Sequence, residues 1–73
     1  MKRRKILNPV VYLQVYYMHL YMKRHNLTIG EFLKLDKQYD ILGYLRIGYE
    51  PFHLTGEEGV LEEIDSYIKV KAK

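Results

Sequence analysis

Residues 8–25 read NPVVYLQVYYMHLYMKRH, and this stretch decides the fold of the chain. Asn8 is a favoured N-cap residue, and Pro9 suits the first helical position because an N–H there would have no intrahelical partner. The stretch predicts a helix from about Pro9 to His25 that is apolar around most of its circumference. Such a helix is either central in its domain or covered by a partner.

Two apolar stripes run along this predicted helix at 100° per residue. One is expected to face the core, and it contains Val10, Leu13, Tyr17, Leu20 and Tyr21. The other is apolar surface in excess of what short companion helices can cover, which is typical of an interface with a second copy or a different protein, unless the second and last helices flank the first on both sides and bury this stripe within a monomer. Its members are the first interface candidates: Val11, Val15, Met18 and Met22.

A capping box predicts the start of the second helix. Glu31 follows Thr28 by three residues, so each side chain can accept a hydrogen bond from the other residue's backbone amide. The helix is expected to run from Ile29 to Asp36 or slightly beyond. Its predicted core residues are Ile29, Phe32, Leu33 and Leu35.

Asp40 is the expected cap of a third helix, from Ile41 to about Tyr49. Pro51 should end that helix, because the residue before a proline avoids the helical region. The predicted apolar contacts of this helix are made by Ile41, Leu42, Tyr44, Leu45 and Ile47.

Thr55 and Glu58 form a second capping box, which predicts the start of the final helix. That helix carries an amphipathic stripe of Val60, Leu61, Ile64, Tyr67 and Ile68. The chain is therefore predicted to be all-α, with a single small domain of about four helices over residues 8–70 after a basic arm at residues 1–7.

The composition supports one small folded domain. The chain has 73 residues, of which 48% are hydrophobic and 29% charged, and this excludes intrinsic disorder. Because there is no cysteine, disulfides and thiolate metal sites are excluded, and a cytoplasmic location is expected. The apolar run of the first helix is too short to span a bilayer and lacks a signal-peptide cleavage site, so no membrane association is expected.

Charge is distributed unevenly along the chain. Residues 1–25 contain six Lys or Arg and no acid, whereas residues 50–68 contain six acids and no Lys or Arg. The favoured interpretation is that complementary faces of one fold attract each other, and the alternative is a basic arm that binds nucleic acid. The acidic face of the last helix supplies the second set of interface candidates: Glu58, Glu62 and Asp65.

The sequence offers few groups for catalysis. His19, His25 and His53 lack metal-ligand spacing, and the only serine has no GxSxG turn. Glu57 and Glu58 are acids of the kind that the first turn of a helix favours. We therefore expect no enzymatic activity, no metal and no cofactor.

The second and third helices could form a helix-turn-helix, a motif that binds DNA through a recognition helix. Such a helix presents Arg, Lys, Asn or Gln to the bases, whereas the predicted third helix offers a single arginine. The basic arm would add phosphate affinity without sequence specificity. The nucleic-acid candidates are Lys2, Arg3, Arg4, Lys5 and Arg46.

A pattern of residues extends from the start of the second helix to the last helix. Its members are Leu27-Thr28, Glu31, Tyr39, Tyr44-Leu45, Tyr49, His53, Thr55-Gly56, Glu58, Ile64 and Tyr67-Ile68. This pattern resembles a short bacterial family known as domain of unknown function 3791. The resemblance covers about residues 10–68, with Asp40 in place of the family's usual glycine and with Pro51 and an inserted Leu54 as further departures.

This resemblance implies a partner protein rather than an enzyme. The family has no established activity, and its members are often encoded beside toxin-like proteins similar to ADP-ribosyltransferases. The expected function is a small non-catalytic protein-interaction module, and in its finer form an antitoxin-like partner of a toxin. A helix-turn-helix-like nucleic-acid-binding regulator is the alternative.

Overall fold

The computed structural model describes residues 8–72 and contains five helices in that range. They are α1 (Pro9–His25), α2 (Ile29–Tyr39), α3 (Ile41–Ile47), α4 (Tyr49–Phe52) and α5 (Glu57–Lys71). The predicted all-α fold is confirmed, and the bounds of the first helix agree with the prediction. The single turn α4 was not predicted.

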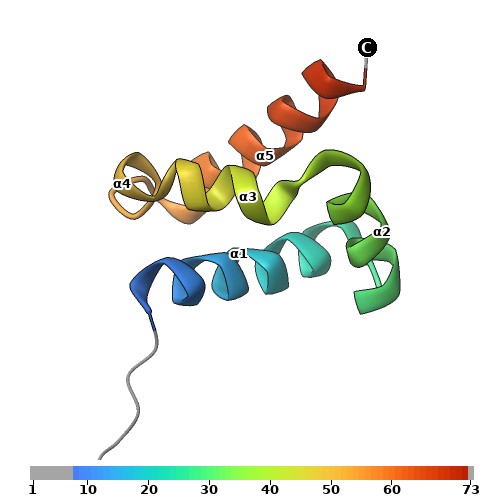
Figure 1. Cartoon of the computed structure of the whole chain (residues 1–73), viewed down its shortest axis with the longest axis horizontal. Helices are drawn as coiled ribbons and strands as arrows, with labels where there is room; N and C mark the ends of the chain where they lie inside the picture. Colours follow the sequence, from blue (N-terminus) through green and yellow to red (C-terminus); the bar gives the residue numbers. More distant parts are fainter. Residues whose placement is uncertain (1–7, 73) are drawn as a thin grey trace, which may run out of the picture.

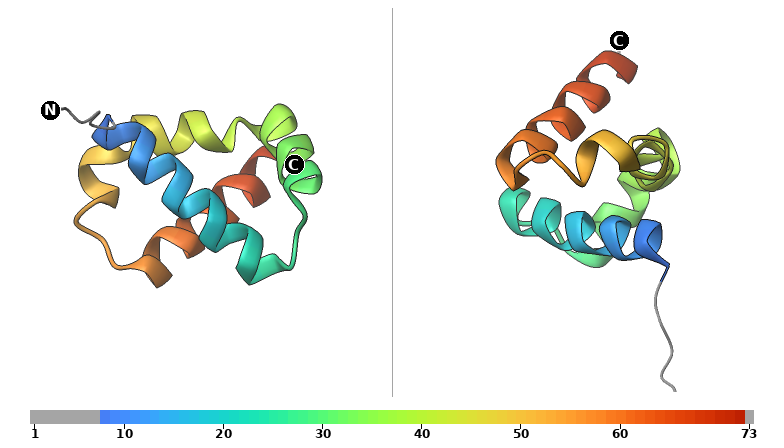
Figure 2. Two further views of the ribbon diagram at one scale, coloured as in Figure 1. Left: turned by 90° about the horizontal axis from the view of Figure 1, so that it is seen from below. Right: turned by 90° about the vertical axis from the view of Figure 1, so that its left-hand side faces the viewer.

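The helices pack around α1, which contacts α2, α3 and α5. In Figure 1, α2 turns the chain at one end of α1, α3 runs back beside α1, and α4 lies at the other end. Figure 2 shows α5 crossing α1 obliquely, with its last turns rising away from the other helices. One long side of α1 faces away from every other helix, as both figures show.

The core contains one side of each long helix. Leu13, Tyr17 and Tyr21 are its members from α1, as predicted. Phe32, Ile41, Leu45, Val60 and Ile64 have no exposed surface, and full burial of such a side chain contributes about 1.5–3 kcal/mol. Three predicted core residues are instead exposed, since α2 and α3 bury only one side: Ile29, Leu33 and Ile47.

The chain reverses at Asp40, which ends α2 and begins α3. Its backbone is left-handed, with φ 55° and ψ 53°, and its N–H donates to the Asp36 carbonyl at 2.7 Å. Its carboxylate accepts from the Gly43 N–H at 3.2 Å, while the Asp36 carboxylate accepts from the Leu42 N–H at 2.8 Å. The predicted cap of the third helix is confirmed, and two carboxylates share that role.

Pro51 does not end the third helix as predicted. The helix stops at Ile47, and Gly48 lies between α3 and α4. Pro51 is the third residue of α4, where a backbone N–H would have no intrahelical acceptor, so the ring is tolerated. A Cβ on Gly48 would lie 2.4 Å from the buried Phe52 ring, so the break depends on glycine.

The two predicted capping boxes have different outcomes. At α2 the box is confirmed, with the Thr28 hydroxyl accepting from the Glu31 N–H at 3.1 Å and the Glu31 carboxylate accepting from the Thr28 N–H at 2.8 Å. At α5 the prediction is wrong, because Gly56 is the N-cap and makes no side-chain cap bond. The Thr55 hydroxyl donates to the Pro51 carbonyl at 2.8 Å and so belongs to the end of α4.

Thr28→Ala should lower the free energy of unfolding by about 1 kcal/mol, because it removes an N-cap acceptor. Thr28→Ser keeps the hydroxyl and should remain close to wild type. Urea denaturation followed by circular dichroism measures both. Equal losses in the two variants would contradict a role for the cap.

Gly48→Ala should destabilise the fold by more than about 1 kcal/mol, since the added methyl group overlaps the Phe52 ring. The matched control is Gly30→Ala in α2, where the nearest atom to an added Cβ is 3.9 Å away. That control should raise stability by roughly 0.5–1 kcal/mol through the better helix propensity of alanine. If thermal melts showed both variants stabilised, close packing at Gly48 would be refuted.

Candidate interaction surface

The side of α1 that the other helices leave most exposed is apolar and aromatic. Its exposed members are Val11 (43%), Tyr12 (60%), Val15 (44%) and Tyr16 (38%), and we call these four residues the outer α1 face. No charged side chain occurs in residues 9–22. A surface helix normally carries charged residues opposite its apolar side, so this uncharged face is unusual for a helix left open to water.

The structure separates the predicted interface stripe of α1 into two parts. Val11 and Val15 are exposed, whereas Met18 and Met22 are partly buried against the core. The exposed surface of α1 continues instead over Tyr12 and Tyr16. A shallow hollow of about 460 Å³ on this side is lined by Val11, Tyr12, Val15, Tyr16, His19 and Leu20.

Tyr12 and Tyr16 also border a second hollow, between the N-terminal half of α1 and α4. The two rings are nearly parallel, with centroids 6.3 Å apart and an interplanar angle of 14°. This second hollow, of about 450 Å³, is called the tyrosine hollow and is lined by Pro9, Tyr12, Leu13, Tyr16, Tyr17, Tyr49 and His53. The two tyrosines therefore form a ridge between two concave surfaces.

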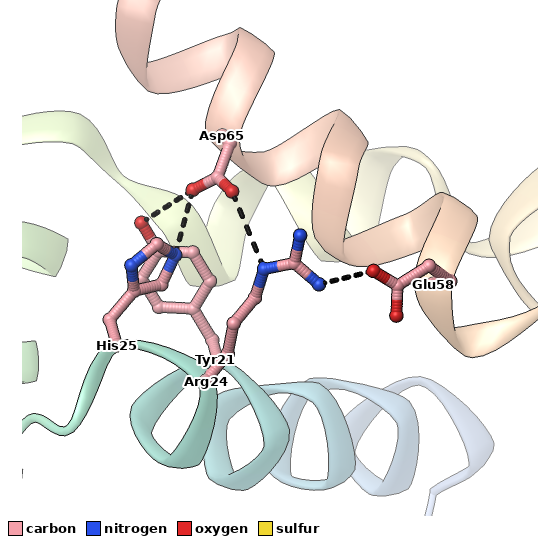
Figure 3. A network of polar contacts seen from close by, with 5 residues as sticks. All are labelled: Tyr21, Arg24, His25, Glu58 and Asp65. Carbon is pink, nitrogen blue, oxygen red and sulfur yellow. Dashed lines mark hydrogen bonds and ion pairs between the residues drawn. The ribbon is translucent and has the colours of Figure 1, made fainter.

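A polar network fixes the C-terminal turn of α1 to α5 (Figure 3). Arg24 Nη1 lies 2.6 Å from Glu58 Oε2, and Arg24 Nε lies 3.7 Å from Asp65 Oδ2. Asp65 Oδ1 also accepts from the Tyr21 hydroxyl at 3.1 Å and lies 3.0 Å from His25 Nε2. These contacts hold the orientation of α5 across α1.

Two of the three residues of the predicted acidic face take part in this network. Glu58 and Asp65 contact α1 within the chain, and Glu62 is exposed. Attraction between the basic and acidic parts of the sequence therefore occurs here inside one fold. Of the nucleic-acid candidates, Arg46 is exposed on α3. The other four lie outside the described residues: Lys2, Arg3, Arg4 and Lys5.

Two groups of the network have perturbed pKa values. Burial raises the pKa of Tyr21 well above its ordinary value of 10.0, and the hydrogen bond to Asp65 and the charge of that carboxylate raise it further. The hydrogen bond to Glu58 raises the pKa of the Arg24 guanidinium. Tyr21 therefore remains a neutral donor to a carboxylate.

The three histidines have different surroundings. His19 is exposed beside the outer α1 face, His25 contacts Asp65, and His53 stacks on Tyr49. Among residues 8–72, no group of three or more His, Asp or Glu side chains is arranged to hold a metal ion. Within the same range, no helix has both the length and the apolar character needed to cross a bilayer.

The chain belongs to a family described as a protein of unknown function, DUF3791, whose model matches residues 12–71. The predicted family resemblance is thereby confirmed. No curated protein and no solved structure matches the chain significantly.

Sequence reasoning missed the tyrosine hollow. Two signals were present: eight tyrosines in 73 residues, and the i, i+4 spacing of Tyr12 and Tyr16. Tyr49 and His53 come from a helical turn that was not predicted, so their proximity to α1 had no visible signal.

Stability should fall as the pH rises above about 10, because the unfolded chain can then lose the Tyr21 proton while the folded chain keeps it. The raised pKa of Tyr21 contributes to the free energy of unfolding, and this contribution is complete below pH 10 and is lost as the pH rises above 10. Urea denaturation across the alkaline range should show a shallower decline for Tyr21→Phe than for wild type. Superimposable declines would contradict a protonated Tyr21 in the folded state.

Proposed function

We propose that this protein is a small non-catalytic interaction module that binds a partner protein through the outer α1 face. The observation that carries the proposal is an exposed apolar and aromatic surface on a helix without charge over residues 9–22. Contiguous apolar surface of this kind is rare on monomers and usually marks an interface.

The other contacts of α1 support a binding role, because they hold the face in place. Leu13 and Tyr17 are buried on the opposite side of the helix. The Gln14 side-chain amide donates to the Leu42 carbonyl on α3 at 2.7 Å, and Arg24 pairs with Glu58 on α5. A helix whose opposite side is already packed against the core loses little backbone entropy when a partner covers the exposed side.

In its finer form, the proposal identifies the partner as a toxin, with this protein acting as its antitoxin-like module. The support is the family resemblance, whose members are often encoded beside toxin-like proteins similar to ADP-ribosyltransferases. Such a role requires a stable complex and no catalytic group in this chain. Neutralisation would follow if the bound module covered the toxin's active site or held it inactive.

Val15→Glu should weaken binding of the partner by at least about tenfold, since it places a charge in the centre of the apolar face. The matched control is Leu33→Glu on α2, which makes a similar change at a residue exposed to a similar extent, 50% against 44%. The full chain is co-expressed with the product of a neighbouring toxin-like gene. Copurification, light scattering after size exclusion and rescue of growth are the measurements.

The control variant should bind as wild type does, and both variants should keep the helical circular dichroism spectrum. Wild-type binding by Val15→Glu would refute the outer α1 face as the interface. A wild-type chain that forms a dimer alone, which Val15→Glu dissociates, would identify a second copy as the partner instead of a toxin.

Measuring the binding of duplex DNA distinguishes the interaction module from the alternative, a nucleic-acid-binding regulator. We expect only weak, sequence-independent binding by the full chain. A nucleic-acid-binding regulator would show affinity that falls steeply with salt and is largely lost when residues 1–5 are removed. Sequence-specific binding that also depends on Arg46 would overturn the interaction-module proposal.

A further inference from the structure

The tyrosine hollow has the composition of a ligand site. It is built from α1 and α4, and its lining contains four tyrosines, one histidine, Pro9 and Leu13, without a carboxylate, lysine or arginine. Its volume of about 450 Å³ is within the range of about 300–1,000 Å³ that is usual for binding pockets. The surface is therefore aromatic and uncharged.

The rings of the hollow are held by one another. Tyr16 and Tyr17 meet edge to face, with centroids 5.1 Å apart and an interplanar angle of 83°. On the α4 side, Tyr49 and His53 are stacked, with centroids 4.7 Å apart, and His53 Nδ1 lies 3.0 Å from the Tyr49 carbonyl oxygen. The aromatic walls thus exist before any ligand binds.

One polar group in the lining lacks a partner in the described part of the chain. Tyr17 is 5% exposed, yet its hydroxyl makes no hydrogen bond within residues 8–72. By contrast, the hydroxyl of its neighbour Tyr16 donates to Glu57, and that of Tyr21 donates to Asp65. Buried polar groups are nearly always paired, so the Tyr17 hydroxyl is a donor that a bound ligand with a hydrogen-bond acceptor could use. Burial raises the pKa of Tyr17, which keeps this hydroxyl protonated as a donor.

We propose that the tyrosine hollow binds a proline-rich segment of the partner protein in the polyproline II conformation, an inference that rests on the proposed interaction function. A polyproline II segment has no internal hydrogen bonds, so its carbonyl oxygens are free acceptors. Proline has no N–H that would need an acceptor, and its ring packs well against aromatic side chains. The ligand and the hollow are therefore complementary in polarity and in the aromatic contacts they can make.

A cationic ligand fits the hollow less well. Recognition of a cation by aromatic rings is strengthened by a nearby carboxylate, and none lines this hollow. Glu57, an acid that contacts a residue of the lining, already accepts a hydrogen bond from Tyr16. A cation would also leave the Tyr17 hydroxyl without an acceptor.

The position of the hollow connects it to the outer α1 face. Tyr12 and Tyr16 line the tyrosine hollow and are also members of that face. A partner that covers Val11 and Val15 could therefore place an adjoining proline-rich segment against the same two rings. The hollow would then determine which partners bind, in addition to the less selective apolar contact.

The test is a titration of the isotope-labelled full chain with a capped polyproline peptide of about ten residues, followed by amide NMR. The expected result is saturable shifts at Tyr12, Tyr49 and His53, with little change at Leu33. Tyr17→Phe keeps the ring and removes the hydroxyl, and it should weaken the peptide about five- to tenfold. The matched control is Tyr39→Phe, which lies outside the hollow and should bind as wild type does.

Two further probes make the test decisive. A capped alanine-glycine peptide of equal length should cause no saturable shifts, and neither should tetramethylammonium, the cation probe. Equal or stronger shifts with either probe, or no binding of polyproline, would overturn the inference. If polyproline fails while Val15→Glu still disrupts the partner complex, only the hollow's role is lost. If polyproline does not bind and Val15→Glu also leaves the partner complex intact, both the ligand site and the proposed function are refuted.

Discussion

The left-handed backbone of Asp40 is the constraint on which the arrangement of the helices depends. Because α2 ends and α3 begins at this one residue, α3 returns beside α1 and closes the core. The Tyr67 hydroxyl donates to the carbonyls of Tyr39 and Asp40, which joins α5 to the same turn. A positive φ is unfavourable for most side chains, but aspartate tolerates it better than most residues and here also caps the next helix.

This turn shows why helix caps could be predicted from sequence. The left-handed φ of Asp40 would also suit glycine, which adopts this region of the backbone map without strain. Thr28 and Asp40 each cap a backbone N–H three positions away, so their signals are local, whereas the contact of Asp36 with the Leu42 N–H spans six positions. The bounds of α1, the Thr28 box and the Asp40 cap were predictable for that reason.

Pro51 and Thr55 were misinterpreted because their local signals fit two structures. A proline ends one helix or occupies the first turn of another, and the choice depends on whether the chain can restart after Gly48. A threonine before a helix can cap that helix, or its hydroxyl can donate to a carbonyl earlier in the chain. Here the chain leaving α4 brings the Thr55 hydroxyl to the Pro51 carbonyl. Tertiary packing of Phe52 selects the outcome, and packing has no local signature in the sequence.

The candidate surface was predictable only in part, because periodicity finds an apolar stripe without showing which edge a neighbour covers. Here Met18 and Met22 contact the core, and the exposed edge of the apolar stripe is formed by Tyr12 and Tyr16 instead. Tyrosine suits that edge, since its ring supplies contact area and its hydroxyl can be paired, as that of Tyr16 is with Glu57. With few side-chain torsions, it also loses little entropy when bound. The part of α1 without charge, residues 9–22, can therefore present a face to water and still be adapted for burial against a partner.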